Sequence, residues 1–366
     1  MDPIAHTLTG GALAASGLKR VTPLATAALL IGANAPDVDV VMQFAGEYAS
    51  LAHRRGWTHG VLALAVWPFV VTGALLAFDR WRSRRAARAE RARAGPLLAV
   101  ATLAVLTHPT LDWLNNYGMR WLMPFDGRWF YGDALFIIDP WVWLVLGGVL
   151  CLAHSERPAS AAAWAVLALA ASVLVFVTSE VPAAARAMWT VGVAAFAAAR
   201  IAGITARTRP RAVERAAAGA LGLVAAYMGV SLLANLPARA EVRAALESAG
   251  IEHVGDVMIG PVPADPFGGQ VVAETPDAYY TGQWHWLESP RFTPSPEPIP
   301  KRDEGPAVAA ARAAPAARRY LVWSRFPYFR IETHAGGYVV RIDDARYPDG
   351  RLGGVVVRLD ENLELR

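Results

Sequence analysis

The sequence predicts an all-α polytopic membrane bundle of six to eight spans, followed by a C-terminal soluble domain that is α+β or mostly β. Hydrophobic residues make up 54% of the 366 residues and charged residues only 18%. Uncharged runs close to the ~20 residues that cross a bilayer recur through the first two thirds of the chain. From residue 237 onward the chain is polar and ends in alternating strand patterns. We therefore expect a transmembrane domain at 1–236 and a C-terminal domain at 237–366.

The hydrophobic runs of the first domain predict its helices in order. Two short Ala/Leu/Gly-rich helices are expected first, at 3–19 and 21–34. Longer spans are then expected at 60–78, 96–114, 137–154, 160–178, 187–204 and 216–236. The run 187–204 is the poorest of them, because Arg186 and Arg200 bracket it closely. In the second domain, residues 306–318 predict an amphipathic helix, while "GYVVRIDDARY" and "GGVVVRLDENLEL" predict strands.

Arginine-rich loops predict the orientation of this bundle. The loop 79–95 holds seven arginines against two acids, and the loop 200–215 holds five arginines against one acid. Lysine and arginine gather on the cytoplasmic side of membrane proteins, so both loops are predicted to be cytoplasmic. Alternation then places 35–59, 115–136, 179–186 and the C-terminal domain outside. No cleavable signal peptide is expected, because "MDPIAHTLTGG" lacks a basic first region.

The net charge and the cysteine count indicate which binding partners and covalent links the chain can have. The net charge of +4 does not indicate nucleic-acid binding, because most of the excess arginine lies in the two loops between spans. The lipid bilayer is the partner that the composition implies. Cys151 is the single cysteine, so no intrachain disulfide can form. The sequence leaves the oligomeric state open.

Under this topology, histidines and carboxylates from separate segments fall in one layer near the outer face of the membrane. They are His6, Asp37, Asp39, His53, His59, His108, Asp112 and Asp139. His108 and Asp112 are four residues apart, which puts both side chains on one face of a helix. Ionisable groups inside a membrane are costly and mark functional sites. The layer therefore predicts a site at the extracytoplasmic face.

The residue types in this layer predict a metal site. Neutral imidazole together with carboxylate is a ligand set for Zn²⁺, and also for Mn²⁺ or Fe²⁺. The predicted ligands are His6, Asp39, His59, His108, Asp112 and Asp139. This set exceeds one tetrahedral site, so one or two ions are expected. A carboxylate that is not a ligand, Asp37 or Asp39, would act as general base, and we assign Asp37 to that role. Arg54 and His53 are expected to meet the substrate, with Arg54 stabilising its charge.

Each of these residues also has a structural explanation. His6 is compatible with an interfacial residue near a terminus, the "PDVD" stretch with a turn capped by aspartates, and Asp139 with a helix N-cap before a proline. Arg54 and Arg55 are compatible with interfacial anchors whose side chains snorkel to the headgroups. In the functional alternative, one of them clamps a phosphate or carboxylate beside the metal. The convergence of five segments on one face argues against all of these structural explanations holding at once.

Four motifs occur in order within residues 1–145: "DPIAHTLTGGAL", "GANAPDVDVV", "HRRGWTHG", and "THPTLDWLNNYGMRWLMPF" followed by "DALFIIDP". In this order they resemble a family of membrane-bound, predicted metal-dependent hydrolases of the LexA-regulated inner-membrane type. The family pattern has a His near the start, Pro-Asp-x-Asp, His-Arg-x-x-Thr-His and His-x-x-x-Asp. It maps onto His6, Asp37/Asp39, His53-Arg54 with Thr58-His59, and His108/Asp112. The resemblance implies a hydrolase of the bacterial inner membrane.

The motif order is also distantly similar to that of zinc-dependent phospholipase C and S1/P1-type nucleases, which implies phosphoester chemistry by analogy. We therefore predict a metal-dependent hydrolase that acts at the extracytoplasmic face, on a phosphoester or other ester of an amphiphilic, lipid-like substrate. Two alternatives remain: a membrane scaffold or regulatory protein with a structural metal site, and a metal or ion transporter. A transporter predicts polar residues at mid-depth of several spans, and 160–178 and 216–236 offer almost none.

Overall fold

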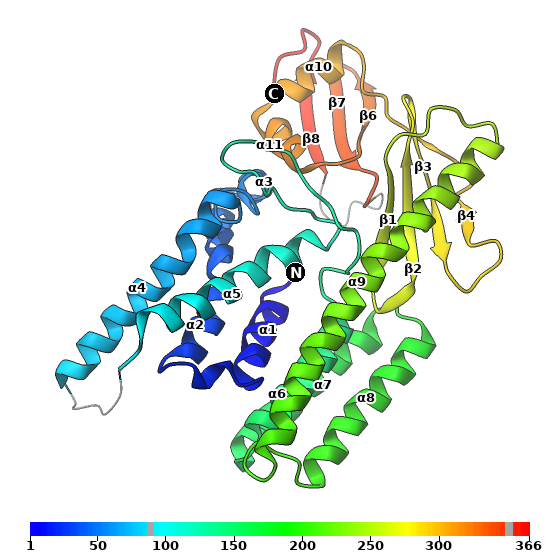
Figure 1. The fold of residues 1–366 in the computed structure, drawn as a ribbon. Coiled ribbons are helices and arrows are strands. Elements are labelled where there is room, and N and C mark those ends of the chain that lie inside the picture. Colours follow the sequence, from blue (N-terminus) through cyan, green and yellow to red (C-terminus); the bar gives the residue numbers. More distant parts are fainter. Residues whose placement is uncertain (86–90, 348–353) are drawn as a thin grey trace. The chain divides into compact units, whose positions relative to one another are not determined.

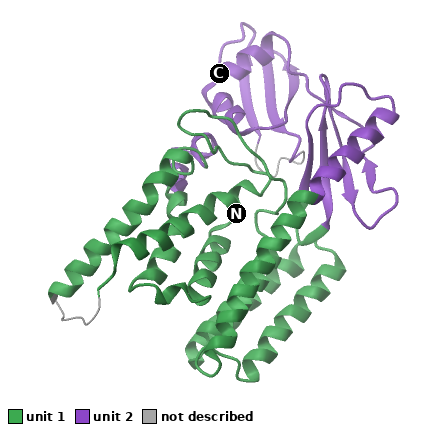
Figure 2. Cartoon of the chain, in the orientation of Figure 1, with its two compact units in different colours: residues 1–38, 55–233, 261–266 green, residues 39–54, 234–260, 267–366 purple. Residues whose placement is uncertain are grey.

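The computed structural model describes residues 1–85, 91–347 and 354–366 (Figure 1). Residues 86–90 of the predicted arginine-rich loop lie outside the described residues. So do residues 348–353, of which only Gly353 belongs to the last predicted strand pattern. The chain divides into two compact units (Figure 2). The first comprises 1–38, 55–233 and 261–266, and the second comprises 39–54, 234–260 and 267–366.

The first unit is helical. Its elements are α1 (Pro3–Ala15), η1 (Leu18–Arg20), α2 (Ala25–Gly32), α4 (Val61–Arg85), α5 (Ala94–Trp113), α6 (Pro140–His154), α7 (Pro158–Val177), α8 (Ala183–Ile201) and the first part of α9 (Pro210–Ser248). The 3₁₀ segment η2 (Ala35–Ala45) starts in this unit and continues, like α9, into the second.

Asp-Pro pairs start two of these helices. The Asp2 carboxylate accepts hydrogen bonds from the backbone N–H groups of Ile4 and Ala5, and Pro3 begins α1. Asp139 and Pro140 repeat the arrangement at α6. An N-cap aspartate satisfies amides that lack a partner within the helix, and proline at the first position loses no hydrogen bond. The local sequence therefore determines where both helices begin.

Small residues allow α2 to pack closely against its two neighbours. A Cβ atom at Gly10 would lie 2.6 Å from the carbonyl oxygen of Leu29, and one at Gly32 would lie 2.9 Å from the Cβ atom of Ala104. Close approach of this kind is typical of helices packed in membranes. It brings the C-terminal end of α2 against α5, where the histidine of "THPTLD" lies.

Four helices within the described residues are long and apolar enough to cross a membrane: α4, α5, α7 and α9. The pair α2 and η2, bent by 41°, would make a fifth if it were one broken span. Helix α6 is apolar but shorter. Helix α8 is not among the helices that are long and apolar enough to cross a membrane. The guanidinium groups of Arg186 and Arg200, at its two ends, donate to the carbonyl oxygens of Thr178 and Ser155. The membrane-helical class is thus confirmed, whereas the count of six to eight spans is not.

The second unit contains β-sheet, as expected for the C-terminal region, and the pairing of its strands is antiparallel. Its strands, with the β1–β2 tip assigned to the first unit, are β1 (Val257–Val262), β2 (Asp265–Glu274), β3 (Ala278–His285), β4 (Phe292–Pro294), β5 (Ile299–Pro300), β6 (Pro327–His334), β7 (Gly337–Asp344) and β8 (Val355–Asp360). They form a five-stranded sheet in the order β1-β2-β3-β4, with β5 also paired to β3, and a three-stranded sheet β6-β7-β8.

The second unit also contains α3 (Glu47–His53), α10 (Pro306–Ala313) and α11 (Pro315–Trp323). The single helix predicted at 306–318 is divided in two, because Ala314 takes an extended conformation before Pro315. Helices α10 and α11 pack against the three-stranded sheet (Figure 1). Tyr48 of α3 packs edge-on against Tyr320 of α11, which explains why the segment 39–54 groups with this unit.

Candidate metal centre

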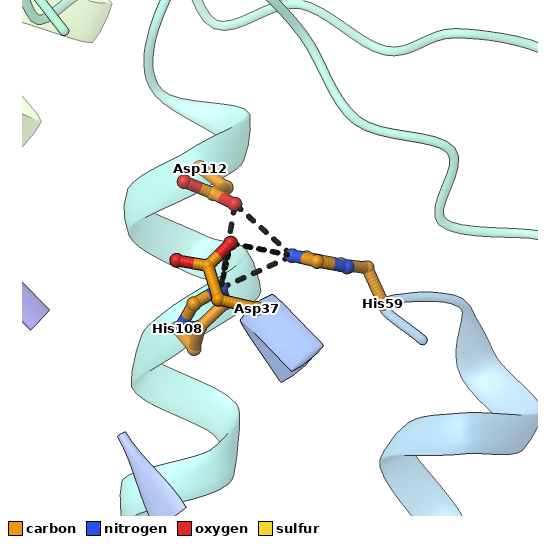
Figure 3. A group of neighbouring side chains, drawn as sticks. All are labelled: Asp37, His59, His108 and Asp112. Atoms are coloured by element: carbon orange, nitrogen blue, oxygen red, sulfur yellow. Dashed lines mark hydrogen bonds and ion pairs between the residues drawn. The ribbon is translucent and has the colours of Figure 1, made fainter. Parts of the chain in front are cut away.

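Four side chains from three parts of the first unit converge (Figure 3). His108 and Asp112 lie one turn apart on α5, His59 lies just before α4, and Asp37 lies in the first turn of η2. One ligand atom from each of the four lies within 4.8 Å of the others. The side chains of His59, His108 and Asp112 are buried, and that of Asp37 is 14% exposed. This combination of residue types and burial gives a candidate metal centre.

The separations between these atoms fit a metal ion. The Nε2 atoms of His59 and His108 are 3.1 Å apart, and they lie 3.3 Å and 3.4 Å from Oδ2 of Asp112. Oδ1 of Asp37 lies 3.8 Å from each Nε2 atom. A tetrahedron of ligands at 2.0–2.1 Å from a zinc ion has edges of about 3.3–3.4 Å. The five separations bracket that value, so the cluster could hold a divalent cation with small adjustments.

A hydrogen bond on the far side of the His108 ring fixes its orientation. Its Nδ1 atom is 2.7 Å from the carbonyl oxygen of Ala33, at the C-terminal end of α2. A carbonyl only accepts, so Nδ1 carries a proton, and in the neutral imidazole Nε2 then presents a lone pair to the cluster. Nδ1 of His59 lies 2.9 Å from the hydroxyl of Thr58. Metal-binding histidines in proteins are oriented in this way, by a partner on the other ring nitrogen.

Asp112 has different neighbours on its two oxygens. Oδ2 faces the two Nε2 atoms, whereas Oδ1 lies 3.3 Å from Nε2 of His6 and 3.1 Å from Nη2 of Arg55. The amino group of Met1 also contacts Oδ1. The ring of His6 stacks on that of His108, with centroids 3.8 Å apart. His6 therefore lies beside the group, but the four converging atoms do not include one of its nitrogens.

The other residues predicted for the site have different surroundings. Asp39, His53 and Arg54 belong to the second unit, where Nε of Arg54 lies 3.6 Å from Oδ1 of Asp39, and Nδ1 of His53 lies 2.9 Å from the carbonyl oxygen of Ala49. Asp139 caps α6 and accepts a hydrogen bond of 2.9 Å from the hydroxyl of Tyr227. The converging group contains none of these four residues.

Arg55 and Asn115 were not singled out for the site from the sequence. Arg55 is buried, its guanidinium faces Asp112, and it donates to Oδ1 of Asn115 at 2.8 Å. A signal for Arg55 was present in the motif spacing. The family pattern Arg-x-x-Thr-His, counted back from Thr58-His59, falls on Arg55 rather than on Arg54.

Comparisons with known proteins agree with the motifs. Residues 1–181 match the family model of the YdjM inner membrane protein. Protein YfhP of Bacillus subtilis (strain 168), described as uncharacterized, is 25% identical over 154 residues, which are 39% of this chain and 43% of that protein. The chain thus spans less than half the length of this curated relative. No solved structure matches. The family predicted from the ordered motifs is the one whose model matches: residues 1–181 are similar to the YdjM inner membrane protein family.

Proposed function

We propose that this chain is a membrane-embedded, metal-dependent hydrolase that acts on a phosphoester or other ester of an amphiphilic substrate. The convergence of Asp37, His59, His108 and Asp112 carries the proposal. Two imidazoles and a carboxylate in a buried setting are a ligand set of catalytic zinc sites, in which a further position stays open. Zn²⁺ is the ion that we propose, with Mn²⁺ or Fe²⁺ as alternatives of the same ligand chemistry.

Differences within the group support separate roles for its members. The three separations among His59, His108 and Asp112 are 3.1–3.4 Å, whereas Asp37 stands 3.8 Å from both rings. Asp37 is also the most exposed of the four side chains. We therefore propose the first three as ligands and Asp37 as the group that faces the open side. A carboxylate in that position can take a proton from a water molecule as general base.

A bound divalent ion would supply Lewis acidity and lower the pKa of a water molecule. The chain's own residues would do the rest. His59, His108 and Asp112 would hold the ion, Asp37 would orient the water and receive its proton, and the buried walls would exclude bulk solvent. The roles of His53 and Arg54 in contacting the substrate stay predictions, because both residues belong to the second unit.

The proposed substrate class and the proposed orientation of the chain follow from where the site lies along its candidate membrane span. The arginine-rich loop 200–215 supports a cytoplasmic position for the turn between α8 and α9, and the opposite ends of these helices then face outward. His108 and Asp112 lie in the last turns of α5, a candidate span. A site at that depth favours a substrate with a polar ester and an apolar tail. We propose the extracytoplasmic face of the inner membrane as its location.

One observation favours a second function, that of a non-enzymatic scaffold with a structural metal. Structural zinc sites are closed by four protein ligands, and the three ligands proposed above are fully buried. If Asp37 served as a fourth ligand, the site would be closed. The two functions therefore differ in the role of Asp37.

Elemental analysis and hydrolysis assays on the detergent-purified full chain test the proposal. The wild type is compared with His108→Ala, Asp112→Asn and the control His154→Ala, whose ring lies outside the group. Substrates are bis(p-nitrophenyl) phosphate, p-nitrophenyl butyrate and phosphatidylcholine vesicles. We expect bound transition metal and turnover in the wild type and the control, and neither in the two site variants. A wild type without metal contradicts the proposal, and bound metal without turnover on any substrate favours the scaffold.

A further inference from the structure

We infer that Arg55 is a positioning residue of this metal centre, which holds Asp112 so that one oxygen is aimed at the ion. The inference rests on the metal site of the proposed function and assigns a role that the motif mapping gave to no residue. Arg55 lies four residues before His59 and is only 3% exposed. An arginine buried so completely must have partners for its charge and its donors, and these partners identify its role.

The guanidinium contacts Asp112 and the turn that follows α5. Nη2 lies 3.1 Å from Oδ1 of Asp112, and Nη1 donates to Oδ1 of Asn115 at 2.8 Å. Longer hydrogen bonds run from Nη1 to the carbonyl oxygens of Gly118 and Asp112, at 3.3 Å and 3.4 Å. The Tyr117 ring lies under the guanidinium, with its centroid 4.5 Å away. The fork is thus held in one plane and one orientation.

This orientation determines the orientation of Asp112. A carboxylate has two oxygens on a rotatable bond, and Arg55 holds one of them. The other oxygen, Oδ2, then points at the Nε2 atoms of His59 and His108. Arginine is suited to this task because its planar fork of donors is rigid, whereas the ammonium group of lysine is a flexible point charge.

The backbone around Arg55 reinforces the contact. Arg55 adopts a left-handed conformation, with φ of 53°, which is uncommon for a residue with a side chain and occurs where surrounding structure enforces it. Its carbonyl oxygen accepts a hydrogen bond from the N–H of Arg120 at 3.0 Å. A Cβ at the next residue, Gly56, would lie 2.6 Å from Nη2 of Arg120. The segment before His59 is therefore fixed against the loop after α5.

The second unit offers a matched control for burial and charge. Arg346 is also buried, pairs with the buried Asp344 at 2.9 Å, and lies over the Trp323 ring at 4.4 Å from its centroid. It thus reproduces the chemistry of Arg55 with Asp112 and Tyr117, in a place where no metal ligand is proposed. Replacing Arg346 should lower stability without changing metal affinity.

The test is a Zn²⁺ titration of the metal-free, detergent-solubilised full chain against a competing chelator. Loss of a partner that orients a ligand weakens metal binding by roughly 10–100-fold. We expect a loss of that size in Arg55→Met, a smaller loss in Arg55→Lys, and wild-type affinity in Arg346→Met. Combined with Asp112→Asn, which itself weakens binding, Arg55→Met should cause no further loss, because it acts through that carboxylate. If Arg55→Met does not fold, Arg55→Lys serves alone. In that variant the absorption spectrum of bound Co²⁺ should differ from that of the wild type.

The outcomes separate this inference from the proposed function. Wild-type affinity in Arg55→Met, or an equal loss in Arg346→Met, overturns the positioning role and leaves the hydrolase proposal intact. An additive loss on the Asp112→Asn background also overturns it. A wild type that binds Zn²⁺ and depends on Arg55 for it, but hydrolyses nothing, supports the positioning role while the hydrolase proposal fails. A wild type that binds no Zn²⁺ overturns both.

Discussion

The Nε2 atoms of His59 and His108 face each other at 3.1 Å, and the second ring is oriented by a hydrogen bond of 2.7 Å from its Nδ1 atom to the carbonyl oxygen of Ala33. With that bond in place, the neutral imidazole of His108 presents the lone pair of Nε2 next to the carboxylate of Asp112. Lone pairs that converge at this distance repel each other unless a cation or a proton lies between them. An ion bound there would satisfy both lone pairs, so in the proposed metal centre the stability of the first unit depends on metal binding.

Metal removal is accordingly expected to destabilise the protein. An ion that binds only the folded state contributes about 4 kcal/mol when its free concentration is roughly 1000-fold above the dissociation constant. We expect a chelator to lower the thermal unfolding midpoint of the wild type and to leave that of His108→Ala unchanged. The control His154→Ala should respond like the wild type. Equal midpoints of the wild type with and without chelator would contradict the prediction.

Metal content is expected to be one divalent ion per chain. Oδ1 of Asp112, the oxygen that a second ion would need, faces the permanent charge of Arg55 at 3.1 Å and the amino group of Met1. A second cation placed there would meet like charge in a buried setting, where repulsion is strong. Elemental analysis of the wild type, normalised to quantitative amino-acid analysis, measures the ratio. A ratio of two would show that a second ion displaces these groups.

Substitution of Asp37 should separate chemistry from metal binding. As the general base, Asp37 would contribute roughly 10²–10⁴-fold to the rate. Asp37→Asn is therefore expected to keep bound metal but to lose turnover by such a factor. Asp126→Asn, in an exposed pair with Arg128, is the control and should behave as the wild type. Loss of metal together with turnover in Asp37→Asn would instead make Asp37 a ligand.

The sequence predicted the membrane-helical class and the strands of the C-terminal region, because hydrophobic runs and alternating patterns are local signals. His108 and Asp112 share a helix face by their spacing, and the topology places His59 near them. The choice between Asp37 and Asp39 had no such signal. In a 3₁₀ helix, residues two apart point about 240° apart around the axis, so only one of them can face α5. The 3₁₀ form of η2 was not predicted.

Two other features could not be predicted from the sequence because tertiary contacts determine them: the role of Asp139, and the burial of Arg55 rather than Arg54. Asp139 is a helix cap whose second oxygen accepts from Tyr227, a residue of α9 that is 88 positions away. Arg54 and Arg55 are adjacent, and composition does not say which one is buried. The asymmetry arises because the turn 112–118 supplies acceptors for only one of them.

Acid is expected to loosen the second unit through Asp344. Burial raises the pKa of this carboxyl, but the charge of Arg346, with hydrogen bonds from Arg346 and Ser324, outweighs it and lowers the pKa from 3.8 to about 2. Because the pKa is depressed in the folded state, the stabilisation is present above pH 3.8 and is lost as the pH falls to about 2. It amounts to roughly 2 kcal/mol.

Hydrogen exchange of the β7 amides between pH 2 and pH 5, corrected for the intrinsic pH dependence of exchange, measures this effect. Protection in the wild type should fall as the pH is lowered from 5 to 2, whereas Asp344→Asn should be less protected at pH 5 and vary less. Asp303→Asn, which removes an exposed partner of Arg312, is the matched control. Parallel pH profiles for the wild type and Asp344→Asn would show that another group governs the acid response.

Orientation in the membrane can be tested with the single cysteine of the chain. In a Cys151→Ala background, a cysteine is introduced at Thr208, in the arginine-rich loop, or at Asn362, in the C-terminal region; both positions are exposed. The positive-inside rule puts the loop in the cytoplasm, and the helix α9 that follows it is a candidate span. A membrane-impermeant maleimide should therefore label Asn362→Cys in intact spheroplasts and Thr208→Cys only after lysis. The reverse pattern would place the C-terminal region in the cytoplasm and, with the same alternation, move the proposed metal centre to the inner face.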